Sequence, residues 1–129
     1  MLGEMILIVD DDPISLTFVR LVLCQAGFTT QTAGDGMEAL DLLQTLQPDL
    51  ILSDIQMPKM DGFELARRTR QILRLRDTPM IAFTACDNRE TEKRAYDAGF
   101  TAYMTKPVEV GGLATGVRRF LEPRTVPCA

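Results

Sequence analysis

Cysteine is scarce in this chain, and its spacing excludes two classes of small protein. Cys24, Cys86 and Cys128 are odd in number and far apart, and no two of them form a CxxC pair. A disulfide framework needs an even set of cysteines, and zinc sites usually contain closely spaced pairs. We therefore expect reduced thiols and a cytoplasmic protein.

Long apolar runs and an excess of positive charge are also missing. The apolar stretches span only a few residues, and the sequence does not open with a basic segment followed by a hydrophobic core. Neither a membrane span nor a secretion signal is expected. Fourteen Lys and Arg face eighteen Asp and Glu, which gives a net charge of -4. This balance disfavours general attraction to nucleic acid or to an anionic membrane.

The composition is that of one globular domain. The chain has 129 residues, of which 46% are hydrophobic and 25% charged, enough to bury a core without disulfides or metals as staples. We expect the domain to span residues 1–122. Residues 123–129 contain two prolines and little apolar content, and are interpreted as a loose tail.

Five short segments are predicted to be strands. Residues 5–9, 49–53 and 79–83 are apolar runs that do not alternate with polar residues. This pattern is typical of parallel strands covered on both faces. The more polar segments 28–32 and 101–104 complete a set of five, and the first of these is polar enough for a sheet edge.

Helical patterns lie between the predicted strands. Asp12 is the expected N-cap of the first helix, Pro13 its first residue and Gly27 its end. The residues at the spacing of a core-facing helical stripe are Ile14, Phe18, Leu21, Val22 and Gln25.

Four more helices follow. Residues 35–38, 61–64 and 87–90 each place Asp three positions before Glu, which resembles a capping box at a helix start. Residues 110–121 keep a helical period despite three glycines. Strands and helices alternate, so the sequence predicts an α/β fold: a doubly wound, five-stranded parallel sheet flanked by five helices.

Three carboxylates follow the first predicted strand with no basic neighbour. Asp10, Asp11 and Asp12 end the run "ILIVDDDPI". Two unit charges about 4 Å apart repel by roughly 4 kcal/mol at an effective dielectric constant near 20, so a folded cluster needs a cation, solvent or hydrogen-bond donors. Asp12 is assigned to the helix cap, whereas Asp10 and Asp11 suit a divalent cation with oxygen ligands, Mg²⁺ or Mn²⁺.

Three further polar residues follow the other buried strands. Asp54, Thr84 and Lys106 come after the third, fourth and fifth strands, so one pocket at the carboxyl end of the sheet can hold them. An exposed Asp54 can act as a nucleophile and form an acyl phosphate. Lys106 would neutralise charge on the transferred group, and Thr84 offers a hydroxyl.

Two charged features are interpreted as structural. Asp61 is expected to cap a helix rather than bind metal. A basic run is not interleaved with aromatic residues, which indicates a solvated helix face rather than a nucleic-acid site. The run comprises Arg67, Arg68, Arg70, Arg74 and Arg76.

Four blocks in fixed order resemble the signatures of response-regulator receiver domains, the phosphoacceptor half of two-component signalling. They are "ILIVDDDP", "LILSDIQMPKMDGFEL", "IAFTA" and "AYMTKPVEV", and the resemblance covers residues 5 to 121. It implies a flavodoxin-like sheet of order 2-1-3-4-5, as in chemotaxis receivers.

The resemblance also implies residue roles. Asp54 would accept the phosphoryl group, and a magnesium ion would be held by Asp10, Asp11, Asp54 and the backbone carbonyl of Gln56. The phosphoryl group would be bound by Lys106, the Thr84 hydroxyl and the Ala85 amide. Thr84 and Tyr103 would act as the switch.

The implied partner is a sensor histidine kinase or a histidine phosphotransfer protein. The domain would catalyse only its own phosphorylation and dephosphorylation, as a monomer or as a weak dimer once phosphorylated. It would stand alone or belong to a hybrid kinase or a longer regulator, and would bind neither nucleic acid nor membrane directly.

Two other functions compete with this interpretation. One is a Mg²⁺-dependent phosphatase with an aspartate nucleophile, in which Asp10 and Asp12 form the acid pair. The other is a flavodoxin-like nucleotide binder, although the "DDDP" segment would repel phosphate unless a metal intervened.

Overall fold

The three apolar runs of the sequence and its two more polar segments form five parallel strands in a single sheet. The computed structural model describes residues 4–86, 88–106 and 110–121. Within them the sheet has the order β2-β1-β3-β4-β5, which confirms the expected architecture and strand order. The strands are β1 (Met5–Val9), β2 (Thr29–Ala33), β3 (Leu50–Ser53), β4 (Met80–Thr84) and β5 (Ala102–Thr105).

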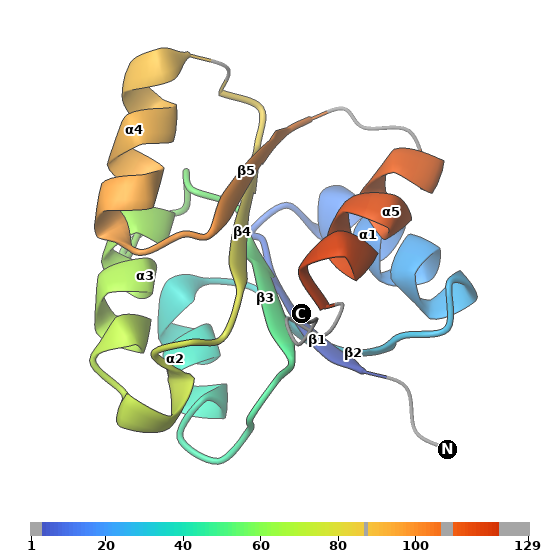
Figure 1. Cartoon of the computed structure of the whole chain (residues 1–129), viewed down its shortest axis with the longest axis horizontal. Coiled ribbons are helices and arrows are strands. Elements are labelled where there is room, and N and C mark those ends of the chain that lie inside the picture. Colours follow the sequence, from blue (N-terminus) through green and yellow to red (C-terminus); the bar gives the residue numbers. More distant parts are fainter. Residues whose placement is uncertain (1–3, 87, 107–109, 122–129) are drawn as a thin grey trace, which may run out of the picture.

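Helices cover both faces of the sheet (Figure 1). Side chains alternate across a strand, so Ile6 and Ile8 of β1 pack in one core layer and Leu7 and Val9 in the other. The first layer contains α1 and α5, and the second contains α2, α3 and α4. The helices are α1 (Pro13–Gln25), α2 (Gly36–Leu42), α3 (Gly62–Arg70), α4 (Arg89–Ala98) and α5 (Val110–Leu121), with a 3₁₀ turn, η1 (Leu73–Leu75).

The helix starts agree with the predicted caps except at α4. The side chains of Asp12, Asp35 and Asp61 each accept a backbone N–H at the start of α1, α2 and α3, as expected. At α4 the cap is Asn88, whose Oδ1 accepts from Thr91 N at 2.8 Å. The sequence pattern had placed this cap at Asp87, which lies outside the described residues, as does the predicted tail 123–129.

The predicted inner face of α1 is wrong except at Val22, which is buried. Ile14, Phe18 and Leu21 are 80%, 42% and 53% exposed, and we refer to them as the α1 apolar stripe. The helix instead buries Val19, Val22 and Leu23. Apolar residues occur nearly all around this helix, so its spacing fits two faces, and only contact with the sheet and α5 selects between them.

The interpretation of the basic run as a solvated face holds only in part. Arg67 and Arg68 are exposed and pair with Glu64. Arg70 is half-buried, and its guanidinium donates to the backbone carbonyls of four residues. Arg74, in η1, donates to the carbonyl of Leu43 at the end of α2 and to that of Leu46 in the segment that follows. The prediction failed here because an arginine stem can cross apolar surface to reach distant acceptors.

The last predicted helix forms as α5, with Leu113 and Val117 buried in the core layer shared with α1. In the ranges that the structure describes, none of the helices combines the length and apolar character needed to cross a membrane.

Candidate functional site

The sheet register brings the acidic residues of two strands together. Val9 of β1 pairs with Ser53 of β3, so the next residues in each strand, Asp10 and Asp54, leave the sheet side by side. Asp54 N also donates to the carbonyl of Val9 at 2.9 Å. Carboxylate oxygens of Asp10, Asp11 and Asp54 all lie within 4.8 Å of one another.

Lys106 reaches the same place from β5. Thr84 pairs with Thr105, and Lys106 N donates to the carbonyl of Thr84 at 2.8 Å. The Lys106 ammonium Nζ then donates to Asp10 Oδ2 at 2.7 Å and to Asp54 Oδ2 at 3.2 Å. The register of the three strand pairs from β1 to β5 thus explains why residues 96 positions apart meet.

The charges of this cluster raise the pKa of Lys106. Burial of Lys106 works to lower its pKa, but the hydrogen bond to Asp10 and the charge of Asp54 outweigh burial, so the pKa of Lys106 is raised above its ordinary value. The ammonium therefore stays protonated at neutral pH and opposes part of the negative charge.

The other oxygens of the three carboxylates differ in burial and in hydrogen bonding. Asp10 is buried, 3% exposed, and its Oδ1 accepts from Asp12 N at 3.0 Å. Asp54 Oδ1 accepts from Ile55 N at 2.6 Å. Asp11 is exposed and makes no hydrogen bond or ion pair with the residues that the structure describes.

The donor set suits a divalent magnesium ion. Three carboxylates and one ammonium leave two negative charges uncompensated, and the side-chain ligand atoms that the cluster offers are carboxylate oxygens. Mg²⁺ favours such ligands and keeps several waters of its own. Asp10, Asp11 and Asp54 could therefore hold it together.

The loop after β4 carries the other predicted residues. Thr84 is buried, and its Oγ1 accepts from Cys86 N at 3.3 Å. Ala85 is exposed. The half-buried Tyr103 of β5 donates its hydroxyl to the backbone carbonyl of Cys86. Tyr103 therefore ties β5 to the loop that carries Thr84 and Ala85.

The segment after Asp54 is held by backbone contacts that the sequence does not predict. Gly62 N donates to the carbonyl of Ile55 at 2.7 Å. A Cβ at Gly62 would lie 2.7 Å from Ile55 Cα and closer still to the carbonyl oxygen of Asp54. Lys59 has a left-handed backbone, with φ of 71°. The sequence indicates a cap at Asp61 and a loop that Gly62 helps to hold open, but it does not show that a side chain at Gly62 would collide with the backbone of residues 54 and 55.

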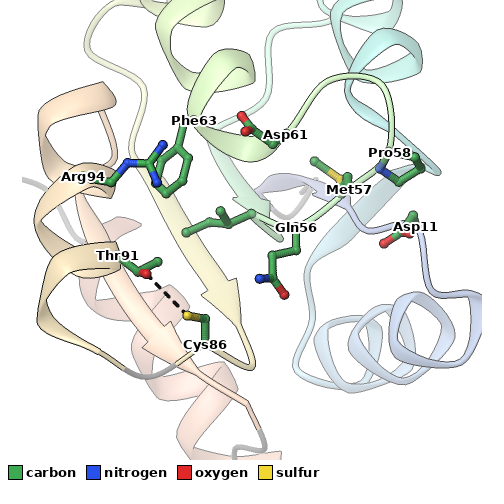
Figure 2. A pocket seen from close by; sticks show the side chains of 10 residues that line it. Asp11, Gln56, Met57, Pro58, Asp61, Phe63, Cys86, Thr91 and Arg94 are labelled. Carbon is green, nitrogen blue, oxygen red and sulfur yellow. Dashed lines mark hydrogen bonds between the residues drawn. The ribbon is translucent and has the colours of Figure 1, made fainter.

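A pocket of about 580 Å³ adjoins the acidic cluster at Asp11. Figure 2 shows that it is lined from the loop after β3, from α3 and from α4. Cys86 Sγ contacts Thr91 Oγ1 at 3.4 Å on one wall, and the guanidinium of Arg94 lies 4.2 Å from the centre of the Phe63 ring on another. These residues come from separate segments, so no sequence motif could have grouped them.

The acid pair required by a phosphatase is not assembled. Asp12 Oδ1 accepts from Ile14 N at 3.1 Å as the cap of α1, while Asp10 is bound to Lys106. The carboxylate that joins Asp10 at the cluster is Asp54.

Residues 6–118 match the family of the response regulator receiver domain. One relative, the DNA-binding dual master transcriptional regulator RpaA of Synechocystis sp., is 39% identical over 116 residues, which make up 90% of this chain and 48% of RpaA. The chain thus spans about half the length of this relative. The matched family gives the phosphatase and nucleotide-binder alternatives no support.

Two solved structures share the fold closely. The chemotaxis response regulator CheY4 of Vibrio cholerae has a TM-score of 0.88 and 32% identity, over 92% of this chain and 99% of CheY4. The receiver domain of sensor histidine kinase PA1611 from Pseudomonas aeruginosa PAO1 has a TM-score of 0.86 and 28% identity, over 92% of this chain and 98% of that domain. The latter was solved with a magnesium ion coordinated in its active-site cleft.

Proposed function

Because this chain belongs to the response regulator receiver domain family of two-component signalling, we propose that it accepts a phosphoryl group on Asp54. The observation that carries the proposal is the meeting of Asp54 with two further carboxylates and the ammonium of Lys106 at one end of the sheet. A carboxylate in such surroundings can attack phosphorus, with oppositely charged groups ready for the transferred oxygens.

The magnesium ion proposed for Asp10, Asp11, Asp54 and the Gln56 carbonyl would supply positive charge for the phosphoryl oxygens when bound. Its presence in the cleft of the PA1611 receiver supports this assignment.

Each residue of the site has a distinct part in the reaction. An oxygen of Asp54 forms a bond to phosphorus as the bond from phosphorus to the donor's leaving atom breaks. Lys106 gives up its contact with Asp54 and binds a phosphoryl oxygen. The Thr84 hydroxyl and the Ala85 amide donate to the other phosphoryl oxygens. The hydroxyl proton of Thr84 is available for this bond, because it has no acceptor among the described residues.

Intact mass spectrometry after incubation with acetyl phosphate tests this function. The expected result is a gain of one phosphoryl group that requires Mg²⁺ and is absent in Asp54→Asn. Asp35→Asn is the matched control, because Asp35 caps α2, belongs neither to the acidic cluster nor to the pocket lining, and Asn caps equally well. Phosphorylation of Asp54→Asn, or its loss in Asp35→Asn, would contradict the assignment.

The physiological donor is proposed to be phosphohistidine on a sensor kinase or a phosphotransfer protein. The α1 apolar stripe supports a protein donor, because Ile14, Phe18 and Leu21 are exposed on the helix that begins immediately after the acidic cluster. A donor protein whose phosphohistidine reaches Asp54 would cover this stripe with an apolar surface of its own.

A charge placed in the stripe separates docking from chemistry. Phe18→Glu is expected to slow transfer at least tenfold from a phosphotransfer protein that phosphorylates the wild type, and to leave the acetyl phosphate reaction unchanged. Leu73→Glu is the control, because Leu73 is 75% exposed in η1, before β4 and so at the opposite end of the sheet. Equal transfer to both variants would argue against α1 as the docking face.

The signal is proposed to pass from Thr84 to Tyr103 through the loop after β4, to which the Tyr103 hydroxyl is hydrogen-bonded. Phosphorylation draws Thr84 towards Asp54, and the hydroxyl of Tyr103 follows the carbonyl of Cys86, to which it is bonded. Such a coupling is typically worth about 1 to 3 kcal/mol. Tyr103→Phe should accept the phosphoryl group normally while changing affinity for a downstream partner.

The setting of the domain is also proposed. Residues 1–122 form the receiver domain and 123–129 a separate tail, either alone or within a hybrid kinase or longer regulator. The domain catalyses only its own phosphorylation and dephosphorylation, as a monomer or weak phosphorylated dimer. Cys24 and Cys86 are free cysteines, which supports a location in the reducing cytoplasm.

A further inference from the structure

The pocket shown in Figure 2 adjoins the acidic cluster that contains Asp54, because Asp11 belongs to both. Its lining includes Asp11, Gln56 and Cys86, which follow Asp10, Asp54 and Thr84 by one or two residues. The loops after β1, β3 and β4 thus all contribute to the lining of the pocket. A group that leaves phosphorus while Asp54 attacks has this cavity beside it.

The pocket is larger than a phosphoryl group needs and has mixed chemistry. Its volume is about 580 Å³, and Ile55, Met57, Pro58 and Phe63 give it apolar surface. Two carboxylates also line it: Asp11 belongs to the acidic cluster, and Asp61 accepts the cap bond from Glu64 N. A short carbon chain with polar ends fits such a surface.

Arg94 is the positively charged side chain among the described lining residues. Its guanidinium stacks 4.2 Å from the centre of the Phe63 ring, and it makes no hydrogen bond or ion pair with the described part of the chain. Phe63 is buried, so the stack holds the guanidinium in place at the pocket wall. A planar guanidinium fixed in this way is prepared to bind a carboxylate through two hydrogen bonds.

We propose that the pocket receives the leaving group of small acyl phosphate donors and that Arg94 selects those whose acyl chain carries a second carboxylate. This proposal rests on the function assigned to Asp54. The substrate class is the acyl phosphate of a dicarboxylic acid, with its phosphoryl end at Asp54 and its distal carboxylate at Arg94.

The reaction balances without any further reactant. An oxygen of Asp54 forms the bond to phosphorus, and the bond between phosphorus and the acyl oxygen breaks. The electron pair of that bond stays with the acyl oxygen, so the leaving group departs as a carboxylate and needs no proton. Arg94 contacts only the distal carboxylate and is a specificity-determining residue, not a catalytic one.

The test compares succinyl phosphate with acetyl phosphate, each with Mg²⁺ and at equal concentrations. The measured quantity is the ratio of the two phosphorylation rates at Asp54, followed by intact mass. Arg94→Gln is expected to lower this ratio about threefold, the size of effect typical for one exposed charge pair. Arg94→Lys keeps the charge but loses the planar donor pair, and should give an intermediate ratio.

Lys93→Gln is the matched control for general electrostatic attraction. Lys93 precedes Arg94 on α4, is exposed and does not line the pocket, so its loss changes net charge equally and should leave the ratio unchanged. An unchanged ratio in Arg94→Gln, or an equal fall in Lys93→Gln, overturns the proposal while leaving Asp54 as phosphoacceptor. Failure of both donors to modify the wild type overturns the proposed function, and this inference with it.

Discussion

Among the described residues, Lys106 is the positively charged side chain that pairs with the acidic cluster. It pairs with Asp10 and Asp54 at once, and their negative charge raises its pKa above the ordinary value of 10.5 despite its burial. A lysine whose pKa is higher in the folded state stabilises that state fully below pH 10.5. The stabilisation is lost as the pH rises through the folded pKa.

Replacing Lys106 should therefore cost stability by an amount that is flat across neutral pH. Lys106→Met is expected to lower the free energy of unfolding by about 1 to 3 kcal/mol without metal, because buried Asp10 loses its partner. Urea unfolding should give the same difference from wild type at pH 7 and pH 9. The difference should shrink only above pH 10.5, and an earlier fall would contradict the raised pKa.

Gly62 holds a position that only glycine fits. Gly62→Ala is expected to lower stability by about 1 to 3 kcal/mol and to slow phosphorylation, because the new methyl group would push the backbone of Asp54 and Ile55. Urea unfolding and intact mass measure the two effects. Gly34→Ala is the control, because its methyl group would meet only Glu38 Oε1, at 3.4 Å.

Thr69 is a buried residue whose hydroxyl has no partner in the described structure. Thr69→Val should raise the free energy of unfolding by about 1 kcal/mol, because it removes an unsatisfied polar atom and keeps the shape of the side chain. Thr101→Val should do the opposite, since the Thr101 hydroxyl accepts from Met80 N at 3.1 Å. A loss of stability in Thr69→Val would show that its hydroxyl is hydrogen-bonded in solution.

Among the elements, several helix ends depend on arginines from other parts of the chain. Arg118 of α5 donates to the carbonyl of Ala26 at the end of α1. Arg74 donates to the carbonyl of Leu43 at the end of α2, and Arg70 to that of Gly99 at the end of α4. The last carbonyls of a helix lack partners within it, and they attract positive charge.

Arg70 should be the most costly of these to replace. Its guanidinium also donates to the carbonyls of Leu75, Arg76 and Thr78, so Arg70→Met is expected to lower the free energy of unfolding by about 2 to 3 kcal/mol. Arg76→Met is the control, because Arg76 is exposed and its side chain makes no bond to the described residues; its effect should stay within about 0.5 kcal/mol. Similar losses in both would mean that charge, not the carbonyl contacts, matters.

The elements also show what sequence patterns can and cannot decide. The strands were predictable because short apolar runs between turn residues have few alternatives. The inner face of α1 was not, since Phe18 and Val19 are both apolar and the choice depends on contacts with the sheet. The start of α4 shifted because Asn88 caps a helix as well as Asp does.

In the molecule as a whole, the two ends of the sheet carry different groups of residues. The carboxyl ends of β1, β3, β4 and β5 carry the acidic cluster, Thr84 and Lys106. The arginine contacts lie where α1, α2 and α4 end and the next parallel strand begins, which is the opposite end of the sheet. The meeting of Asp10, Asp54 and Lys106 could be predicted because parallel strands place their following residues at one edge. The Arg94 pocket could not, because it depends on how α3 and α4 pack.

Magnesium should stabilise the entire fold through the acidic cluster. At about ten times its dissociation constant, a ligand that binds only the folded state adds roughly 1.4 kcal/mol, which raises the melting temperature by a few degrees. Asp10→Asn should reduce this rise, whereas Asp41→Asn, on the exposed side of α2, should not. Thermal unfolding with EDTA and with Mg²⁺ measures it, and an equal rise in both variants would place the metal elsewhere.

The double contact of Lys106 has a consequence for spectroscopy. An ammonium held by two carboxylates and largely shielded from solvent exchanges its protons more slowly than a freely hydrated one. Its side-chain nitrogen should then give a resolved NMR signal in ordinary isotope-labelled samples. Such a signal would report the arrival of a phosphoryl group directly, with no attached probe.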